Sequence, residues 1–132
     1  MLVLNHGIDL VDCNRIGRLV ARHGQRFLER VFTKTELEYA NSGRNRLERL
    51  AGRFAAKEAV LKLIGTGWST GTCWTEIEVV NDPMGRPLVR LAGRVQQIAL
   101  QKGIQQVQIS ITHAANLAIA SAVALAEAHG QQ

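Results

Sequence analysis

Residues 46–64 have the sequence RLERLAGRFAAKEAVLKLI, and Gly65 follows directly. The run is rich in strong helix formers and contains no proline, and a glycine immediately after such a run is typical of a helix C-terminus. We therefore expect one long helix from about Arg46 to Ile64. At 1.5 Å per residue such a helix is about 28 Å long, so it should form the centre of a small domain.

The apolar residues of this helix fall on one side. At about 100° per residue, a sector of roughly 60° contains four of them, namely Leu47, Leu50, Phe54 and Leu61. Glu58 projects about 40° from Phe54, inside the same apolar side. A carboxylate in that position is costly unless it is paired or bound to a cation.

Two explanations of Glu58 remain open on geometry. The first is an ordinary ion pair with Lys62, one turn further along the helix. The second is a metal site, which needs another carboxylate from elsewhere in the chain. Asp9 is the candidate, because it interrupts an apolar strand in which aspartate is disfavoured. An edge or turn position would also explain Asp9.

Two carboxylates from separate elements would suit a magnesium ion that also binds a diphosphate. Magnesium prefers oxygen ligands and is commonly shared between one or two carboxylates and substrate phosphates. Three cationic side chains of the helix would then neutralise the remaining phosphate charge, namely Arg53, Lys57 and Lys62.

The chain preceding the long helix has signals for a strand and several short helices. Asp12 is a candidate helix N-cap, and Thr33 with Glu36 forms a capping box. The expected elements are a strand at residues 3–11 broken near Gly7, a helix that starts at Cys13 and resumes after Gly24 to about Val31, a short helix from Thr33 to about Tyr39, and a loop at 41–45.

The chain following the long helix has mostly strand signals. Alternating apolar residues predict strands, and turn residues separate them. The expected elements are a flexible or tightly turned segment at 65–73, a strand at 74–80, a turn at 82–85, a strand at 87–91, a helix at 92–102, a half-buried strand at 107–112 and a last strand at 117–125. Both faces of the last strand are apolar, so we expect a helix or another subunit to cover each of them. The whole chain, residues 1–132, reads as one α+β domain, with a small antiparallel sheet packed against the long helix.

Five arginines occur at helical spacing before the long helix. On a continuous helix they would form one stripe about 120° wide, made of Arg15, Arg18, Arg22, Arg26 and Arg30. Gly24 is a candidate break between the first three and the last two. The stripe is either a solvated basic face, a docking surface for an acidic helix, or a surface for nucleic-acid phosphates.

The composition limits the class of protein. Hydrophobic residues make up 46% and charged residues 20% of the 132 residues, as in folded globular domains. The net charge of +5 arises in residues 1–66, which indicates an anionic partner. The sequence has no apolar run of membrane-spanning length and no helix-turn-helix or zinc-ligand spacing. Its first twelve residues lack the pattern of a secretion signal, so we do not expect secretion. We expect a cytoplasmic protein with reduced cysteines, no membrane partner, and nucleic acid only as a second choice.

With these residues in view, the chain resembles the holo-acyl-carrier-protein synthase family of phosphopantetheinyl transferases. The resemblance spans residues 5–125, and its most specific part is Leu50 to Ala59 running into Lys62 and Gly65-Thr66-Gly67. The other matching segments are Gly7 to Asp12 with Arg15-Ile16, Phe32-Thr33, Glu36-Leu37, Trp74 to Val79, Gly85-Arg86-Pro87 and Ser110 to His113. One departure is Leu117, which stands where the family commonly has an aromatic residue and affects the expected local packing.

The resemblance implies an activity and a set of site residues. It implies transfer of 4'-phosphopantetheine from coenzyme A to a serine of apo acyl carrier protein, in fatty acid biosynthesis, with release of adenosine 3',5'-bisphosphate. It further implies magnesium on Asp9 and Glu58, and coenzyme A phosphates on Arg53, Lys62 and His113. The same resemblance implies that the carrier protein docks on Arg15, Arg18 and Arg22, and that three copies form a homotrimer with active sites between subunits.

The mechanism expected from this resemblance is positioning and charge neutralisation. Asp9, Glu58 and Lys62 are the residues placed at the reacting phosphate, and the serine proton would go to Glu58 or to a water on the metal. Two other functions remain open: a non-catalytic basic adaptor that binds nucleic acid or an acidic protein, and a magnesium-dependent nucleotide hydrolase. The first leaves Asp9 and Glu58 unexplained, and the second expects no carrier protein.

Overall fold

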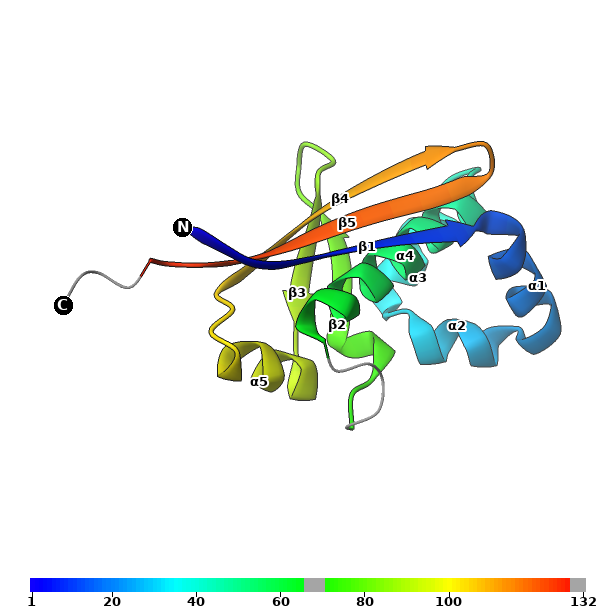
Figure 1. Ribbon diagram of the computed structural model, residues 1–132. Helices are drawn as coiled ribbons and strands as arrows, with labels where there is room; N and C mark the ends of the chain where they lie inside the picture. The colour runs from blue at the N-terminus through cyan, green and yellow to red at the C-terminus, as the bar shows by residue number, and fades with distance from the viewer. Residues whose placement is uncertain (66–70, 129–132) are drawn as a thin grey trace.

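The long helix is present as α4 (Arg46–Ile64) in the computed structural model, which describes residues 1–65 and 71–128. It packs against a three-stranded antiparallel sheet with the strand order β1-β5-β4. The strands are β1 (Leu2–Asp12), β4 (Gln106–Ala114) and β5 (Leu117–Ala126). Figure 1 shows the long strands running side by side across the molecule, with α4 beneath them. The expected α+β architecture around a central helix is confirmed.

The central strand β5 packs closely on α4 because its inner face is made of alanines. Ala118, Ala120, Ala122 and Ala124 are almost fully buried. Their neighbours on β1 are Gly7, Asp9 and Val11, which therefore share the inner face with them. Small side chains here let the helix lie close to the sheet. The expectation that a helix covers one apolar face of the last strand is confirmed.

At Gly7, the backbone of strand β1 lies directly against the backbone of α4. A methyl group on Gly7 would collide with the backbone carbonyl of Ala59 and lie 3.1 Å from the amide nitrogen of Leu63. The strand continues through Gly7, so the expected break there is wrong; the irregularity is a register shift between Val3 and Asn5. Gly7 is therefore needed for close approach to the helix rather than for a turn.

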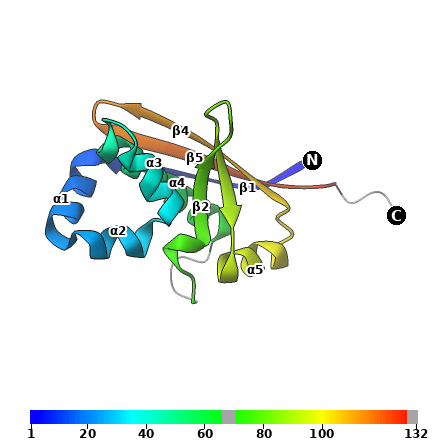
Figure 2. The same cartoon turned by 180° about the vertical axis from the view of Figure 1, so that it is seen from behind.

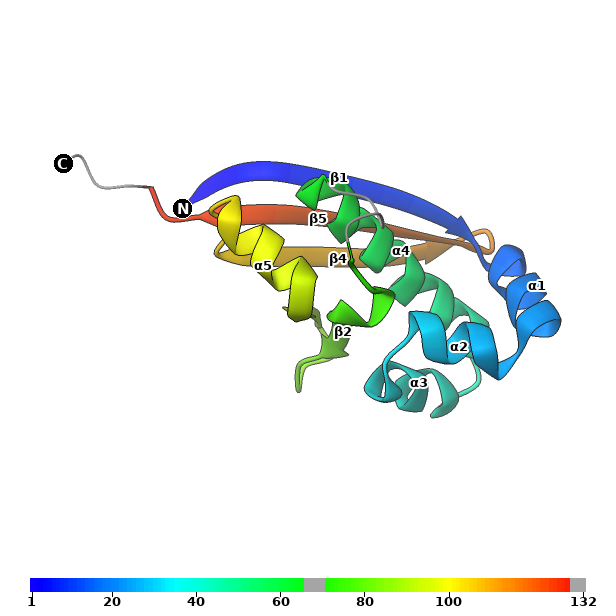
Figure 3. The ribbon, with the colours of Figure 1, turned by 90° about the horizontal axis from the view of Figure 1, so that it is seen from below.

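The remaining helices follow the expected start signals. Figures 2 and 3 show α1 (Cys13–His23), α2 (Gln25–Val31) and α3 (Lys34–Asn41) grouped at one end of the molecule. The Asp12 carboxylate caps α1 by accepting from the Asn14 amide at 2.8 Å. Thr33 and Glu36 form the expected capping box of α3. Gly24 has φ +56° and separates α1 from α2, as its place in the sequence suggested.

A second, two-stranded sheet completes the fold. It pairs β2 (Ile77–Asn81) with β3 (Pro87–Leu91), and α5 (Gly93–Gln101) follows it. The expected strand from Trp74 starts only at Ile77, because residues 74–76 form the 3-10 turn η1. The expectation for 65–73 lies partly outside the described residues; Gly65 and Gly71 at its ends have φ +84° and +77°.

One residue of the expected buried stripe is exposed. Leu50, Phe54 and Leu61 are at most 4% exposed, as expected, but Leu47 is 38% exposed. Leu47 lies in the first turn of α4 and faces α1, where a methyl group on Gly17 would be 3.3 Å from its Cδ1.

The outer face of the three-stranded sheet has no described helix on it; α4 and α5 lie across the inner face in Figure 3. On this outer face β1 and β5 carry apolar side chains, whereas β4 carries Gln106, Gln108, Ser110 and Thr112. Val3, Ile8 and Leu10 point outward and are 64%, 61% and 56% exposed. Val123 and Leu125 of β5 lie on the same face and are half-buried. Within the described part of the chain, this second face of β5 therefore stays open to a partner. None of the helices in this part of the chain has both the length and the hydrophobicity of a membrane span.

We predict that Gly7→Ala lowers the free energy of unfolding by about 1–3 kcal/mol or more, because the added methyl meets backbone and cannot be avoided by a side-chain rotation. Urea unfolding measures this. Gly17→Ala is the matched control: it meets only the Leu47 side chain at 3.3 Å and adds helix propensity inside α1. Equal stability of the Gly7→Ala variant and the parent would contradict the close packing of β1 on α4.

Candidate active site

Asp9 and Lys62 are in direct contact between β1 and the last turn of α4. The Lys62 ammonium donates to Asp9 Oδ1 at 2.9 Å and to the Ile8 carbonyl at 3.0 Å. The Asp9 side chain is 17% exposed, whereas that of Lys62 is 56% exposed. β1 is an edge strand, but Asp9 lies on its inner face, toward the helix. The contact therefore joins two of the candidate catalytic residues.

Glu58 lies one turn before Lys62 on α4 and is half-buried. The hydrogen bond and the charge of Asp9 raise the pKa of Lys62, and the charge of Glu58 adds to the increase. The ammonium thus lies within the field of both carboxylates. An ion pair between Glu58 and Lys62 therefore does not fully describe this contact, because the Lys62 ammonium donates its hydrogen bond to Asp9.

The donor set suits a hard divalent cation that shares its ligands with a substrate. Asp9 and Glu58 supply carboxylate oxygens, which magnesium prefers. No group of three or more His, Cys, Asp or Glu side chains that could hold a metal occurs within residues 1–65 and 71–128. Two carboxylates do not form a closed protein cage, but a magnesium ion that keeps water and phosphate ligands needs only one or two. The residues therefore fit magnesium better than zinc.

Arg53 points away from this carboxylate pair. Its guanidinium lies 3.8 Å from the centre of the Tyr39 ring and donates to Asn81 Oδ1. The residue is only 5% exposed, and its Nε is buried without a hydrogen-bond partner within the described residues. Burial lowers the pKa of Arg53, while Tyr39 and Glu36 raise it. In this chain Arg53 is thus held by a ring and an amide from other elements.

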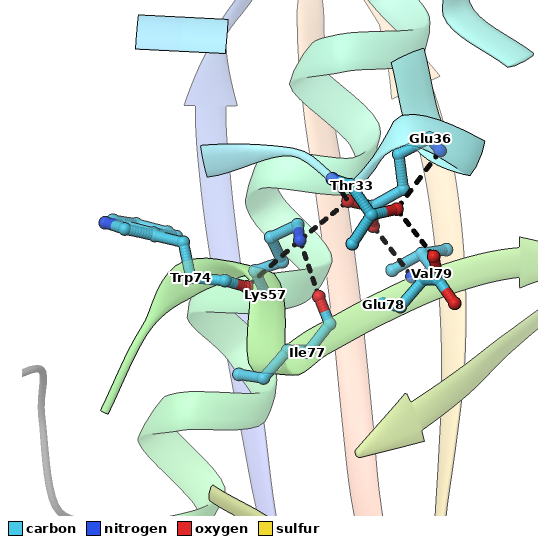
Figure 4. Close-up of polar contacts among 7 residues, drawn as sticks. All are labelled: Thr33, Glu36, Lys57, Trp74, Ile77, Glu78 and Val79. Carbon is cyan, nitrogen blue, oxygen red and sulfur yellow. Dashed lines mark hydrogen bonds and ion pairs between the residues drawn. The ribbon is translucent and has the colours of Figure 1, made fainter. Parts of the chain in front are cut away.

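Lys57 is buried, which corrects the expectation that it neutralises phosphate. Its ammonium pairs with Glu36 at 2.7 Å and donates to the carbonyls of Trp74 and Ile77 (Figure 4). Both side chains of the ion pair are fully buried. Burial lowers the pKa of Lys57, and the charge of Glu36 opposes this. Lys57 therefore joins segments of the fold and cannot reach a ligand.

Glu36 completes this buried network. Its carboxylate accepts from the amides of Thr33 and Val79, at 2.8 and 2.7 Å, in addition to Lys57. The capping box was visible in the sequence, but the contacts with Lys57 and Val79 join residues far apart in the chain. No sequence spacing would have indicated them, although a lysine beside an apolar stripe was a weak sign of burial.

His113 lies at the other end of α4 from the carboxylates. Its Nε2 is 2.9 Å from the Glu48 carbonyl, and its ring is close to Gly52. Glu48 and Glu58 are ten residues apart, so they are separated by about 15 Å along the helix. The structure therefore does not bring His113 together with Asp9, Glu58 and Lys62 within one chain.

The arginines Arg15, Arg18 and Arg22 are all exposed on α1. The Arg15 guanidinium lies 5.6 Å from the centre of the Phe54 ring, and Phe54 stacks on Trp74 at 4.9 Å. Because α1 ends at Gly24, the five-arginine stripe is not continuous. The basic surface nearest the long helix is thus that of α1.

A groove of about 740 Å³ lies next to β3 of the second sheet. Its walls come from β3, β4 and α5, and include Arg86, Ser110 and Ile111. The volume is within the usual range for small-molecule sites. Since Ser110 and Ile111 precede His113 on β4, the groove and the histidine lie along one strand.

Comparisons with known proteins identify the family of the chain. The model of the 4'-phosphopantetheinyl transferase superfamily matches residues 5–122. The holo-[acyl-carrier-protein] synthase of Koribacter versatilis is 41% identical over 122 residues, covering 92% of this chain and 98% of its own length. That of Desulforudis audaxviator is 40% identical over 131 residues, covering 99% of both chains.

Solved structures give the same result. The holo-[acyl-carrier-protein] synthase of Neisseria meningitidis matches with a TM-score of 0.86 and 31% identity, over 94% of this chain and 99% of that one. The Helicobacter pylori enzyme, solved in complex with coenzyme A, matches with a TM-score of 0.80 and 31% identity, over 91% and 99%. The family model, the similar relatives and the solved structures agree in sequence coverage and fold, and the chain belongs to the 4'-phosphopantetheinyl transferase superfamily.

Proposed function

We propose that this protein is a holo-acyl-carrier-protein synthase that transfers 4'-phosphopantetheine from coenzyme A to a serine of apo acyl carrier protein. The observation that carries the proposal is the meeting of β1 and α4, where Lys62 binds Asp9 within the field of Glu58. The similar curated proteins are named holo-[acyl-carrier-protein] synthase, and structures of that name from Helicobacter pylori and Bacillus anthracis were solved in complex with coenzyme A.

Asp9 and Glu58 are the residues that would hold magnesium. When bound there, the ion would neutralise charge on the diphosphate of coenzyme A and so favour the departure of a phosphate. The proposal is supported by the two oxygen donors and by the adjacent ammonium of Lys62, a positive charge that lies against Asp9 where β1 meets α4.

The chain's own residues position the reactants and move the proton. The serine oxygen forms a bond to the pantetheine-side phosphorus, and the bond from that phosphorus to the bridging oxygen breaks. Adenosine 3',5'-bisphosphate then leaves with the bridging oxygen. Lys62 is placed to neutralise the phosphate charge, since its side chain is largely exposed and its pKa is raised, which keeps it protonated. Glu58 is our candidate acceptor of the serine proton.

The carrier protein would dock on the exposed arginines of α1. Arg15 lies over Phe54, which is a residue of the motif helix, so a helix bound along α1 is placed beside α4. A basic surface of this kind speeds the encounter with an acidic partner. We therefore assign Arg15, Arg18 and Arg22 to the carrier protein.

The complete active site requires a second copy of the chain. One coenzyme A molecule would contact both Lys62 and His113 only if these came from different subunits, because they lie at opposite ends of α4. The open apolar face formed by Val3, Ile8 and Leu10 provides a surface for self-association. We propose a homotrimer in which His113 contacts coenzyme A at a neighbour's Asp9–Glu58 pair, while Arg53, which is only 5% exposed, stays bound to Tyr39 and Asn81.

The two free cysteines, Cys13 and Cys73, support the expected cytoplasmic location, where thiols stay reduced. A basic adaptor is a weaker candidate function, because it gives no reason for Asp9 and Lys62 to meet on the inner face of the sheet. A nucleotide hydrolase would use the same carboxylates but needs no carrier surface on α1.

Mass spectrometry of an apo carrier protein incubated with the protein, coenzyme A and magnesium tests the activity. We expect the carrier to gain one phosphopantetheine group. Asp9→Asn and Glu58→Gln should each slow the transfer about 100-fold or more, because loss of a ligand weakens binding of the ion that neutralises the phosphates. Asp12→Asn is the matched control, since asparagine also caps a helix well.

Two results would contradict this assignment. Transfer that is independent of magnesium, or that survives both site substitutions at the parental rate, would exclude the carboxylate site. Hydrolysis of coenzyme A to phosphopantetheine and adenosine 3',5'-bisphosphate without any acceptor protein would favour a hydrolase instead.

Light scattering coupled to gel filtration tests the assembly. We predict that Val3→Glu shifts the protein from a trimer toward a monomer, because a carboxylate on the apolar face would be buried without a partner. Met84→Glu, at the 92% exposed tip of the β2–β3 hairpin, should leave the mass unchanged. A parent protein that is monomeric at micromolar concentration would refute the shared site.

A further inference from the structure

We propose that Asn5 is a positioning residue, which sets the place of α4 along β1 and thereby the separation of Asp9 and Glu58. The inference rests on the proposed magnesium site and adds a residue to it that contacts neither substrate nor ion. The Asn5 amide donates from Nδ2 to the carbonyl of Leu63 at 2.8 Å. Its Oδ1 accepts from the amide of His6 at 2.9 Å, so both ends of the side chain are used.

The register shift of β1 explains why Asn5 can reach the helix. Val3 pairs with Leu125 on the outer face, and with regular alternation Asn5 would follow it there. The shift between Val3 and Asn5 instead pairs Asn5 with Ala124 on the inner face, in phase with Gly7 and Asp9. Such irregularities commonly redirect a side chain near a functional site.

Three contacts then connect β1 and the C-terminal half of α4. Asn5 binds the carbonyl of Leu63, the Gly7 backbone lies against the carbonyl of Ala59, and Lys62 binds Ile8 and Asp9. The Gly7 contact is steric and limits how close the two elements come. The contact of Lys62 is made by a long and exposed side chain. Asn5 makes its hydrogen bond through a short side chain, and we infer that this bond opposes sliding of α4 along its own axis relative to β1.

Sliding of α4 relative to β1 would weaken magnesium binding, because the ion requires its oxygen ligands within a narrow range of distances. One residue of helix corresponds to 1.5 Å, and a shift of this size is large compared with magnesium–oxygen distances of about 2.0–2.1 Å. A shift of α4 along β1 moves Glu58 relative to Asp9 directly, since each residue is fixed to one of the two elements. Loss of groups that orient metal ligands typically costs 10–100-fold in metal affinity.

A second residue at the same helix end provides a control. Lys102, just after α5, donates to the carbonyl of Ile64. It caps the same turn of α4 as Asn5 does, but it does not connect that turn to β1. If Asn5 acted only as a helix cap, the loss of Lys102 would have the same consequences as the loss of Asn5.

The test compares Asn5→Leu with Lys102→Met in the full chain. Binding of Mn²⁺, a spectroscopic substitute for magnesium, is measured by electron paramagnetic resonance with coenzyme A present, and transfer is measured over a range of magnesium concentrations. We expect Asn5→Leu to raise both the Mn²⁺ dissociation constant and the half-saturating magnesium concentration about tenfold, with little change in the rate at saturation. Lys102→Met should leave both constants at the parental values, and Asn5→Gln, which keeps an amide donor, should restore part of the affinity.

Parental metal constants in Asn5→Leu, or equal shifts in Asn5→Leu and Lys102→Met, would overturn the proposal. If Asn5→Leu does not fold, Asn5→Asp replaces it: it has similar size and lacks the donor, and the same shift is expected. Measurements on the parent protein distinguish a failure of this inference from a failure of the proposed activity. If the parent does not transfer phosphopantetheine, the activity is refuted, while the Mn²⁺ dissociation constants still test the role of Asn5.

Discussion

The close contact between the edge strand β1 and the helix α4 is the constraint on which the candidate site depends. Asp9 belongs to the strand, and Glu58 and Lys62 belong to the helix, so no local element brings them together. The backbone at Gly7 lies against Ala59, and the neighbouring strand β5 packs on α4 through buried alanines. A larger residue at these positions would separate the carboxylates even if each one kept its own secondary structure.

The buried pair of Lys57 and Glu36 has a different role in the same helix. Removing two charges from water is costly, and the pair persists because every polar atom of the ammonium and carboxylate has a partner. The network fixes the start of β2 and the start of α3 against α4. Lys57 therefore stabilises the fold, whereas we assign its neighbour Glu58 to the proposed metal site.

Much of this arrangement could be predicted from the sequence, and the failures have physical reasons. The sequence alone indicates the features that depend on local signals, namely the long helix, the caps at Asp12 and Thr33, and the isolated Asp9. The expectation that Lys57 contacts phosphate was wrong, because helical spacing predicts the direction in which a side chain points but not how much protein covers it. The role of Gly7 and the contact of Asn5 depend on how a strand and a helix meet, which no local pattern encodes. Separation of His113 from Lys62 likewise follows only from the packed fold.

The central claim is that Asp9 and Glu58 share one divalent cation at the junction of β1 and α4. A crystal grown with Mn²⁺ and coenzyme A measures this directly through anomalous scattering. The account predicts one strong anomalous peak about 2.2 Å from a carboxylate oxygen of Asp9 and from one of Glu58, as expected for an ion with hard oxygen ligands. A peak elsewhere with coenzyme A bound, or coenzyme A bound with no peak between these two residues, would contradict it.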